Sequence, residues 1–141
     1  MASWKHQSLI GAPVQDVWAL VGDPRSYPDW AADVLEVTGF PEEVMLGAEW
    51  DQTTKSPFGK QRTRFVVDEF NDLREIRMRC TDSGYYSHWV LTEAGGDTFA
   101  ELEIGMEPER ISGKVIDRTV GKRWYRSAAT SMLDRIRAKL S

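Results

Sequence analysis

The sequence contains two histidines, His6 and His88, and histidine is the side chain that most readily exchanges a proton near neutral pH. His6 shares the alternation of Trp4 and Ile10, so we expect its ring to face the interior of a sheet. His88 falls on the opposite parity to Trp89, which predicts a surface position. His6 is therefore the candidate proton shuttle, although an isolated inward histidine is more often an ordinary wall residue.

The other common reactive groups lack the pattern that their chemistry needs. Cys80 is the single cysteine, and its inward parity predicts a small buried apolar group. Two histidines and one cysteine on separate strands make no closed set of metal ligands. No G-x-S-x-G elbow or P-loop spacing occurs. The sequence therefore predicts no metal, no cofactor and no nucleotide.

Composition narrows the class of protein and of partner. The chain has 141 residues, 41% of them hydrophobic and 28% charged, so we expect one globular domain over residues 1–141. A formal net charge of −4 makes nucleic acid a poor partner. No apolar run approaches the roughly 20 residues of a bilayer span. The start MASWKHQSLIG has no apolar signal core, which favours the cytoplasm.

The first 30 residues read as a strand followed by short helices. Residues 4–10 alternate as a strand does, and a helix is predicted over residues 13–21 with Pro13 in its first turn. The apolar spacing places Trp18 on the buried stripe of that helix. The aromatic segment DPRSYPDW, residues 23–30, is too broken by proline for a strand. Asp23 can cap a helical turn that starts at Pro24, so two short helical turns are predicted.

Strands dominate the middle of the chain, and a helix ends it. Alternating or β-branched segments bounded by turn residues predict six strands, over residues 34–40, 48–56, 60–71, 74–82, 85–93 and 98–107. Short loops between them indicate an antiparallel meander. A long helix is predicted over residues 111–140, with Leu133 on its buried stripe and Gly113 and Gly121 weakening its first half.

The register IGAPVQDVWALVGDPRSYPDW resembles the opening of the polyketide cyclase and START-like (SRPBCC) superfamily. This resemblance implies the helix-grip fold, of class α+β, in which a seven-stranded antiparallel sheet wraps around a long C-terminal helix. Two short helices follow the first strand in that fold, and a cavity lies between the sheet and the helices. The resemblance covers the whole chain in the order of its elements.

An apolar lining with a few polar points is predicted for that cavity. The candidate ligand-binding residues are Tyr27, Trp30, Trp50, Gln52, Thr54, Phe65, Met78, Trp89, Met106 and Tyr125. This mixture suits a flat hydrophobic molecule held by a few hydrogen bonds, and it also suits a filled core. Within DPRSYPDW we expect Trp30 to be structural and Tyr27 to lie at the rim of the cavity.

Three functions follow from these residues. The first is a binding protein for a small hydrophobic molecule such as a lipid, a quinone or an aromatic metabolite. The second is a polyketide aromatase/cyclase that promotes aldol closure and dehydration, with His6 as proton shuttle, Tyr125 or Arg118 polarising a carbonyl group and Thr54 orienting the chain. The third is a protein-interaction module with a vestigial cavity, and its basic helix face would be Arg118, Lys122, Arg123 and Arg126.

Overall fold

The computed structural model describes residues 3–31, 33–56, 59–106 and 118–140, with residues 56 and 118–122 described by their backbone alone. The elements are, in chain order, β1 (Ser3–Ile10), α1 (Val14–Val21), η1 (Pro24–Ser26), α2 (Tyr27–Trp30), β2 (Val34–Thr38), β3 (Glu49–Ser56), β4 (Gly59–Asn71), β5 (Glu75–Cys80), β6 (Tyr85–Ala94), β7 (Asp97–Met106) and α3 (Arg118–Leu140). Each predicted strand is present with its ends moved by at most two residues.

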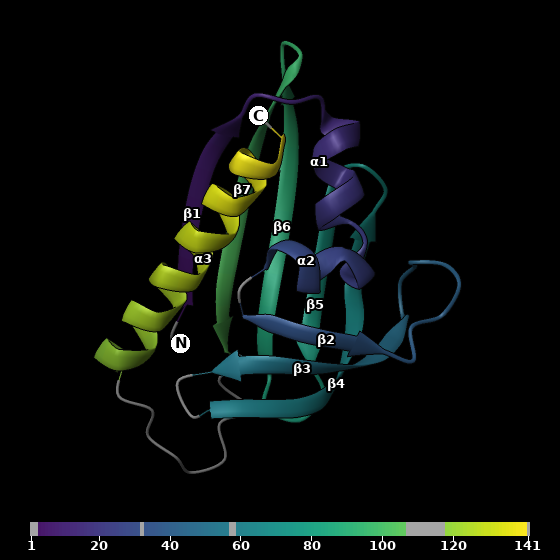
Figure 1. The fold of residues 1–141 in the computed structure, drawn as a ribbon, viewed down its shortest axis with the longest axis vertical. Coiled ribbons are helices and arrows are strands. Elements are labelled where there is room, and N and C mark those ends of the chain that lie inside the picture. Colours follow the sequence, from purple (N-terminus) through teal and green to yellow (C-terminus); the bar gives the residue numbers. More distant parts are fainter. Residues whose placement is uncertain (1–2, 32, 57–58, 107–117, 141) are drawn as a thin grey trace.

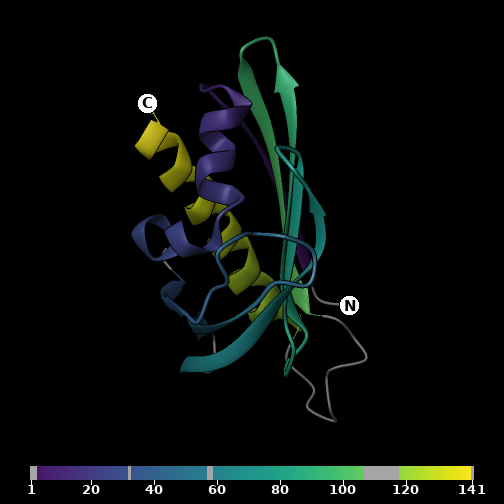
Figure 2. The same ribbon diagram turned by 90° about the vertical axis from the view of Figure 1, so that its right-hand side faces the viewer.

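The strands form one antiparallel sheet in the order β1-β7-β6-β5-β4-β3-β2. Bulges interrupt β2 between Val34 and Glu36 and β4 between Val67 and Glu69, and a bulge bends its strand. In Figure 1, β2 and β3 run crosswise to β6 and β7 at the lower end of the molecule. Figure 2 shows α1, α2 and α3 together on one side of the sheet. The predicted helix-grip arrangement is confirmed.

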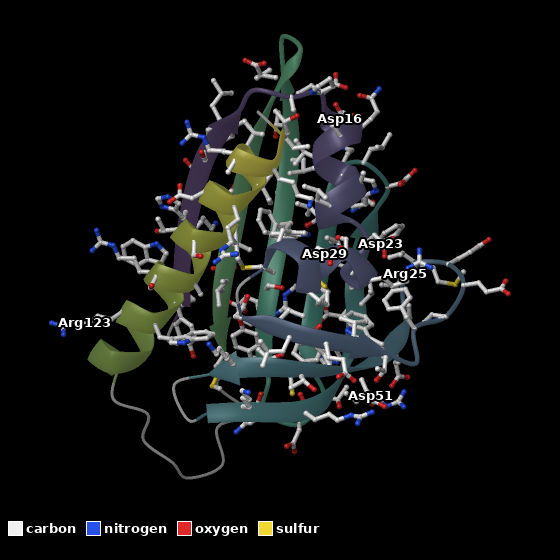
Figure 3. All side chains as sticks on the ribbon, viewed as in Figure 1. Asp16, Asp23, Arg25, Asp29, Asp51 and Arg123 are labelled. Carbon is white, nitrogen blue, oxygen red and sulfur yellow. The ribbon has the colours of Figure 1, made fainter. Side chains whose placement is uncertain are left out.

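The segment DPRSYPDW forms the two short helical turns that its prolines and Asp23 predicted. Asp23 Oδ1 accepts hydrogen bonds from the backbone N–H of Arg25 at 3.1 Å and from its Nε at 2.9 Å. This capping contact holds Pro24 in the first position of η1. Trp30 Nε1 donates to Ser26 Oγ at 3.1 Å, which ties α2 back to η1. Figure 3 shows Asp23 and Arg25 beside these turns.

The helices bury the stripes expected from their spacing, with one exception. Leu133 of α3 is 1% exposed, as predicted for a core residue. The prediction that Trp18 is a core residue is wrong, because its ring lies at the edge of α1 and is only partly buried. It packs against Phe70 of β4 with a ring-centroid distance of 5.9 Å. The predicted helix start at residues 111–117, including Gly113, lies outside the described residues.

Gly22 ends α1 directly against the Trp18 indole. A Cβ atom at this position would overlap atoms of that ring, so the ring would have to leave its contact with Phe70. We expect Gly22→Ala to lower the free energy of unfolding by about 1–3 kcal/mol, the usual cost of overpacking. Denaturant melts would measure the change. Gly11→Ala is the matched control, because a Cβ at Gly11 meets no atom within 4 Å.

Candidate ligand-binding site

Four aromatic rings meet near the end of the sheet where β6 begins. Tyr85, the first residue of β6, lies with its ring centroid 6.4 Å from Phe65 of β4, 5.8 Å from Trp124 and 6.5 Å from Tyr125 of α3. We call Phe65, Tyr85, Trp124 and Tyr125 the aromatic cluster. Phe65 and Tyr125 are buried, while Tyr85 and Trp124 are half-buried and so reach the surface. Three separate elements therefore build one apolar site with an exposed side.

A row of polar groups on β3 adjoins the cluster. Trp50 Nε1 donates to Gln52 Oε1 at 2.9 Å, and Gln52 Nε2 donates to Thr54 Oγ1 at 3.0 Å. All three side chains are buried, since alternate residues of β3 point to the same face. The Trp50 ring stacks on Phe65 at 6.0 Å, which joins the row to the aromatic cluster.

Asp33, just before β2, adds a carboxyl group to this interior. It is 9% exposed, and the hydroxyl of Tyr85 donates to its Oδ2 atom at 3.2 Å. The other oxygen, Oδ1, is buried and has no hydrogen-bond partner among the described residues. Burial raises the pKa of Asp33 from 3.8 to about 6, against the opposing effects of its own backbone N–H and the Tyr85 hydroxyl. Burial, followed by the charge of Asp33, raises the pKa of Tyr85 well above its usual value.

Sequence reasoning missed both members of this pair. A signal for Asp33 was present, since it is the one acidic residue in the apolar run WAADVL, residues 30–35. Tyr85 gave no such signal, because it is separated from Asp33 by 52 residues and only the fold brings them together.

Tyr27, Trp30 and Trp89 form a second, fully buried group of rings. Tyr27 lies 4.8 Å from Trp30, and Trp30 lies 6.0 Å from Trp89. The prediction that Tyr27 lies at a cavity rim is wrong, because its side chain is 2% exposed and its hydroxyl donates to the Val21 carbonyl at 2.6 Å. Trp30, also 2% exposed, has the structural position expected of it.

His6 lies apart from the aromatic cluster. Strand register places it beside Leu102 of β7, which pairs in turn with Trp89. Tyr85 pairs instead with Met106, four residues further along β7, or about 13 Å at ~3.3 Å per residue. The structure therefore brings Tyr125 to Tyr85 and leaves the half-buried His6 in another row of the sheet.

The remaining predicted residues have mixed positions. Met78 is buried in β5, and Met106 is half-buried beside Tyr85. Arg118 begins α3, and its side chain lies outside the described residues.

Two open grooves on the described surface lie away from the aromatic cluster. One, of about 630 Å³, follows a single face of α3 and is lined by Arg123, Arg126, Ser127, Thr130, Ser131, Asp134, Arg135 and Ala138. Arg123 projects away from the sheet in Figure 3. The other, of about 370 Å³, separates the end of β1 from the last turns of α3. The cluster itself is packed ring against ring.

The family model for polyketide cyclase/dehydrase and lipid transport proteins matches residues 1–141. The chain belongs to this family. Its members typically bind hydrophobic ligands. None of the helices in the described ranges is both long and apolar enough to span a bilayer.

Solved structures of the same fold include three that cover almost the whole chain. A START superfamily protein from Mycobacterium smegmatis has a TM-score of 0.78 at 10% identity, over 98% of this chain and 96% of that one. The Zhui aromatase/cyclase from a Streptomyces species has 0.73 at 14%, over 98% and 92%. The protein XoxI from Bacillus cereus has 0.74 at 16%, over 99% and 96%. No curated protein matches the chain.

Proposed function

We propose that this protein binds a flat hydrophobic small molecule at the aromatic cluster. The observation that carries the proposal is that the four rings of the aromatic cluster contact one another, and that two of them, Tyr85 and Trp124, are still half-exposed. Aromatic walls with a few polar groups are typical of sites for drug-sized ligands. The row from Trp50 to Thr54 and the Asp33 carboxyl supply those polar groups.

The ligand would reach this site by parting the rings. Centroid distances of 5.6–6.5 Å among Tyr85, Trp124 and Tyr125 leave no room for another ring between them. Tyr85 and Trp124 are the members with solvent on one side, so they are the ones that would move. The same close packing would be expected of a protein-interaction module, and native mass spectrometry of the purified protein separates the two functions by a retained small molecule.

Trp124→Ala tests the proposed site directly. Removing this ring takes away one wall, so we expect the dissociation constant of a neutral aromatic probe, 2-methoxynaphthalene, to rise about tenfold, which corresponds to ~1.4 kcal/mol. Calorimetric titration of the folded variant would measure it. Trp124 is half-buried, so the variant should fold.

Trp18→Ala is the matched control for this titration. Trp18 is also half-buried, but it packs on Phe70 and α1, away from the aromatic cluster. We expect its probe affinity to equal that of the unmodified protein. Equal weakening in both variants, or in neither, would remove the aromatic cluster from the proposed site.

A polyketide aromatase/cyclase is the second candidate function. The observation in its favour is a buried carboxyl group, Asp33, hydrogen-bonded to the Tyr85 phenol beside Tyr125. Proton transfer and carbonyl polarisation, which aldol closure needs, are reactions of such groups. In this proposal Tyr125, Arg118 and Thr54 keep the functions expected from the sequence, and His6 acts only if the substrate extends to β1.

A further inference from the structure

The Oδ1 atom of Asp33 is a hydrogen-bond acceptor that the described part of the chain leaves unused. We infer that Asp33 is the polar anchor of the binding site, accepting a hydrogen bond through Oδ1 from a phenolic or enolic hydroxyl on the edge of a flat aromatic ligand. This inference rests on the proposed function, and it adds the chemical class of the ligand.

Asp33 is held in place by its backbone. The backbone N–H of Lys55 on β3 donates to the Asp33 carbonyl at 2.7 Å, and the N–H of Val34 donates to the Ala31 carbonyl at 3.1 Å. The first contact ties Asp33 to β3, and the second ties the residue after it to Ala31. An acceptor whose position is already held costs a ligand little ordering on binding.

The partner of Asp33 places its free oxygen next to the aromatic rings. The Tyr85 hydroxyl occupies Oδ2, and the Tyr85 ring itself belongs to the aromatic cluster. A planar ligand that replaces part of the contact between Tyr85 and Trp124 would therefore have its edge close to the carboxyl group. Only Oδ1 is then available to a polar group on that edge.

The titratable side chains around Asp33 are phenols, and they leave its Oδ1 atom without a hydrogen-bond donor. The titratable side chains that face it are Tyr27 from α2, Tyr85 from β6 and, beyond Tyr85, Tyr125 from α3. Oδ1 of Asp33 has no hydrogen-bond partner, cationic or neutral, among the described residues. A buried acceptor without a donor is unfavourable, so a donor on the ligand is favoured strongly.

A hydroxyl fits this site better than an ammonium group. An ammonium brings three N–H donors, and the carboxyl group offers one unused oxygen. One carboxylate oxygen accepts at most two hydrogen bonds, so at least one of the three donors would stay unpaired among aromatic rings, which is costly for a charged group. A hydroxyl group brings one donor, which Oδ1 of Asp33 can accept, so no donor stays unpaired.

A pair of probes that differ by one donor tests the inference. 2-Naphthol and its methyl ether, 2-methoxynaphthalene, have the same ring system, and only the former donates a hydrogen bond. We expect 2-naphthol to bind about tenfold more tightly at pH 7.5 by calorimetric titration, the range of a hydrogen bond to a charged group. In Asp33→Leu, which removes both acceptor oxygens while keeping an apolar side chain of similar size, the preference should disappear.

The outcomes separate this inference from the proposed function. Binding of neither probe would overturn both. Binding of both with an unchanged ratio in Asp33→Leu would overturn the anchor and leave the ligand-binding function standing. Tighter binding of 2-naphthylmethylamine than of 2-naphthol would overturn the hydroxyl as the recognised group.

The unmodified protein provides a second test that needs no variant. As the pH falls below about 6, Asp33 takes up a proton and its acceptor strength falls. The preference for 2-naphthol over the ether should therefore shrink several-fold between pH 7.5 and pH 5. A ratio that stays constant over this range would also overturn the anchor.

Discussion

Trp89→Ala is expected to lower the free energy of unfolding by about 3–5 kcal/mol, the usual cost of truncating a buried tryptophan. Trp89 is 0% exposed and lies in a row of the sheet between Leu102 and Ile76, both of them 0% exposed. Its ring also contacts Trp30, which joins α2 to the sheet. The substitution would thus open a cavity where helix and sheet meet. Urea melts followed by far-UV circular dichroism would measure the loss.

Trp18→Ala serves as the comparison for this experiment. It removes the same side chain from the edge of α1, where the ring is only partly buried, so we expect a loss of about 1–2 kcal/mol. An equal or larger loss than for Trp89→Ala would show that the core is centred on α1 and not on the sheet.

Asp33→Asn is expected to raise the free energy of unfolding by about 1–3 kcal/mol at pH 8. Burial raises the pKa of Asp33 from 3.8 to about 6, and each unit of difference between the folded and unfolded states corresponds to ~1.4 kcal/mol. Asparagine carries no charge and can still accept a hydrogen bond from Tyr85, so it avoids the cost of burying an ionised carboxyl group. Its amide N–H groups, which take the place of the unpaired Oδ1 atom, offset part of this gain. The Asp33→Asn variant would thus be more stable but would lose the carboxylate proposed as the anchor of the ligand.

The sign of this effect follows from proton binding. Between pH 4 and pH 6 the folded protein holds the Asp33 proton more tightly than the unfolded chain, so the contribution of Asp33 to stability falls as the pH rises through this window. The gain in Asp33→Asn should therefore be smallest near pH 3.5 and largest above about pH 7. Chemical melts at a series of pH values would trace it.

Asp29→Asn is the matched control, since Asp29 is an exposed residue of the neighbouring α2. It should change stability by less than about 0.5 kcal/mol at either pH. A variant Asp33→Asn that is less stable than the unmodified protein at pH 8 would contradict the prediction and show that the ionised carboxylate is well compensated in the fold.

The order and type of the elements could be predicted from local patterns in the sequence. Alternation over β7, the apolar spacing of α1 and the turn residues between strands are local patterns, and each depends on neighbours a few positions away. The caps and prolines of DPRSYPDW likewise act within η1 and α2. These signals predict the elements and their order, and the resemblance to the polyketide cyclase and START-like superfamily implied the helix-grip fold that the structure has.

Which side chains share a site could not be predicted from these local patterns, because it depends on how distant elements pack together. Period-2 alternation tells which face of the sheet a residue occupies but not which residues of other elements lie beside it. His6 of β1 and Tyr125 of α3 could therefore both be predicted to line the interior, although they lie apart in the structure. Tyr27 was assigned to a rim that its hydrogen bond to Val21 excludes. The Asp33–Tyr85 contact joins the residue before β2 to the first residue of β6, and no local pattern encodes a contact between residues 52 positions apart.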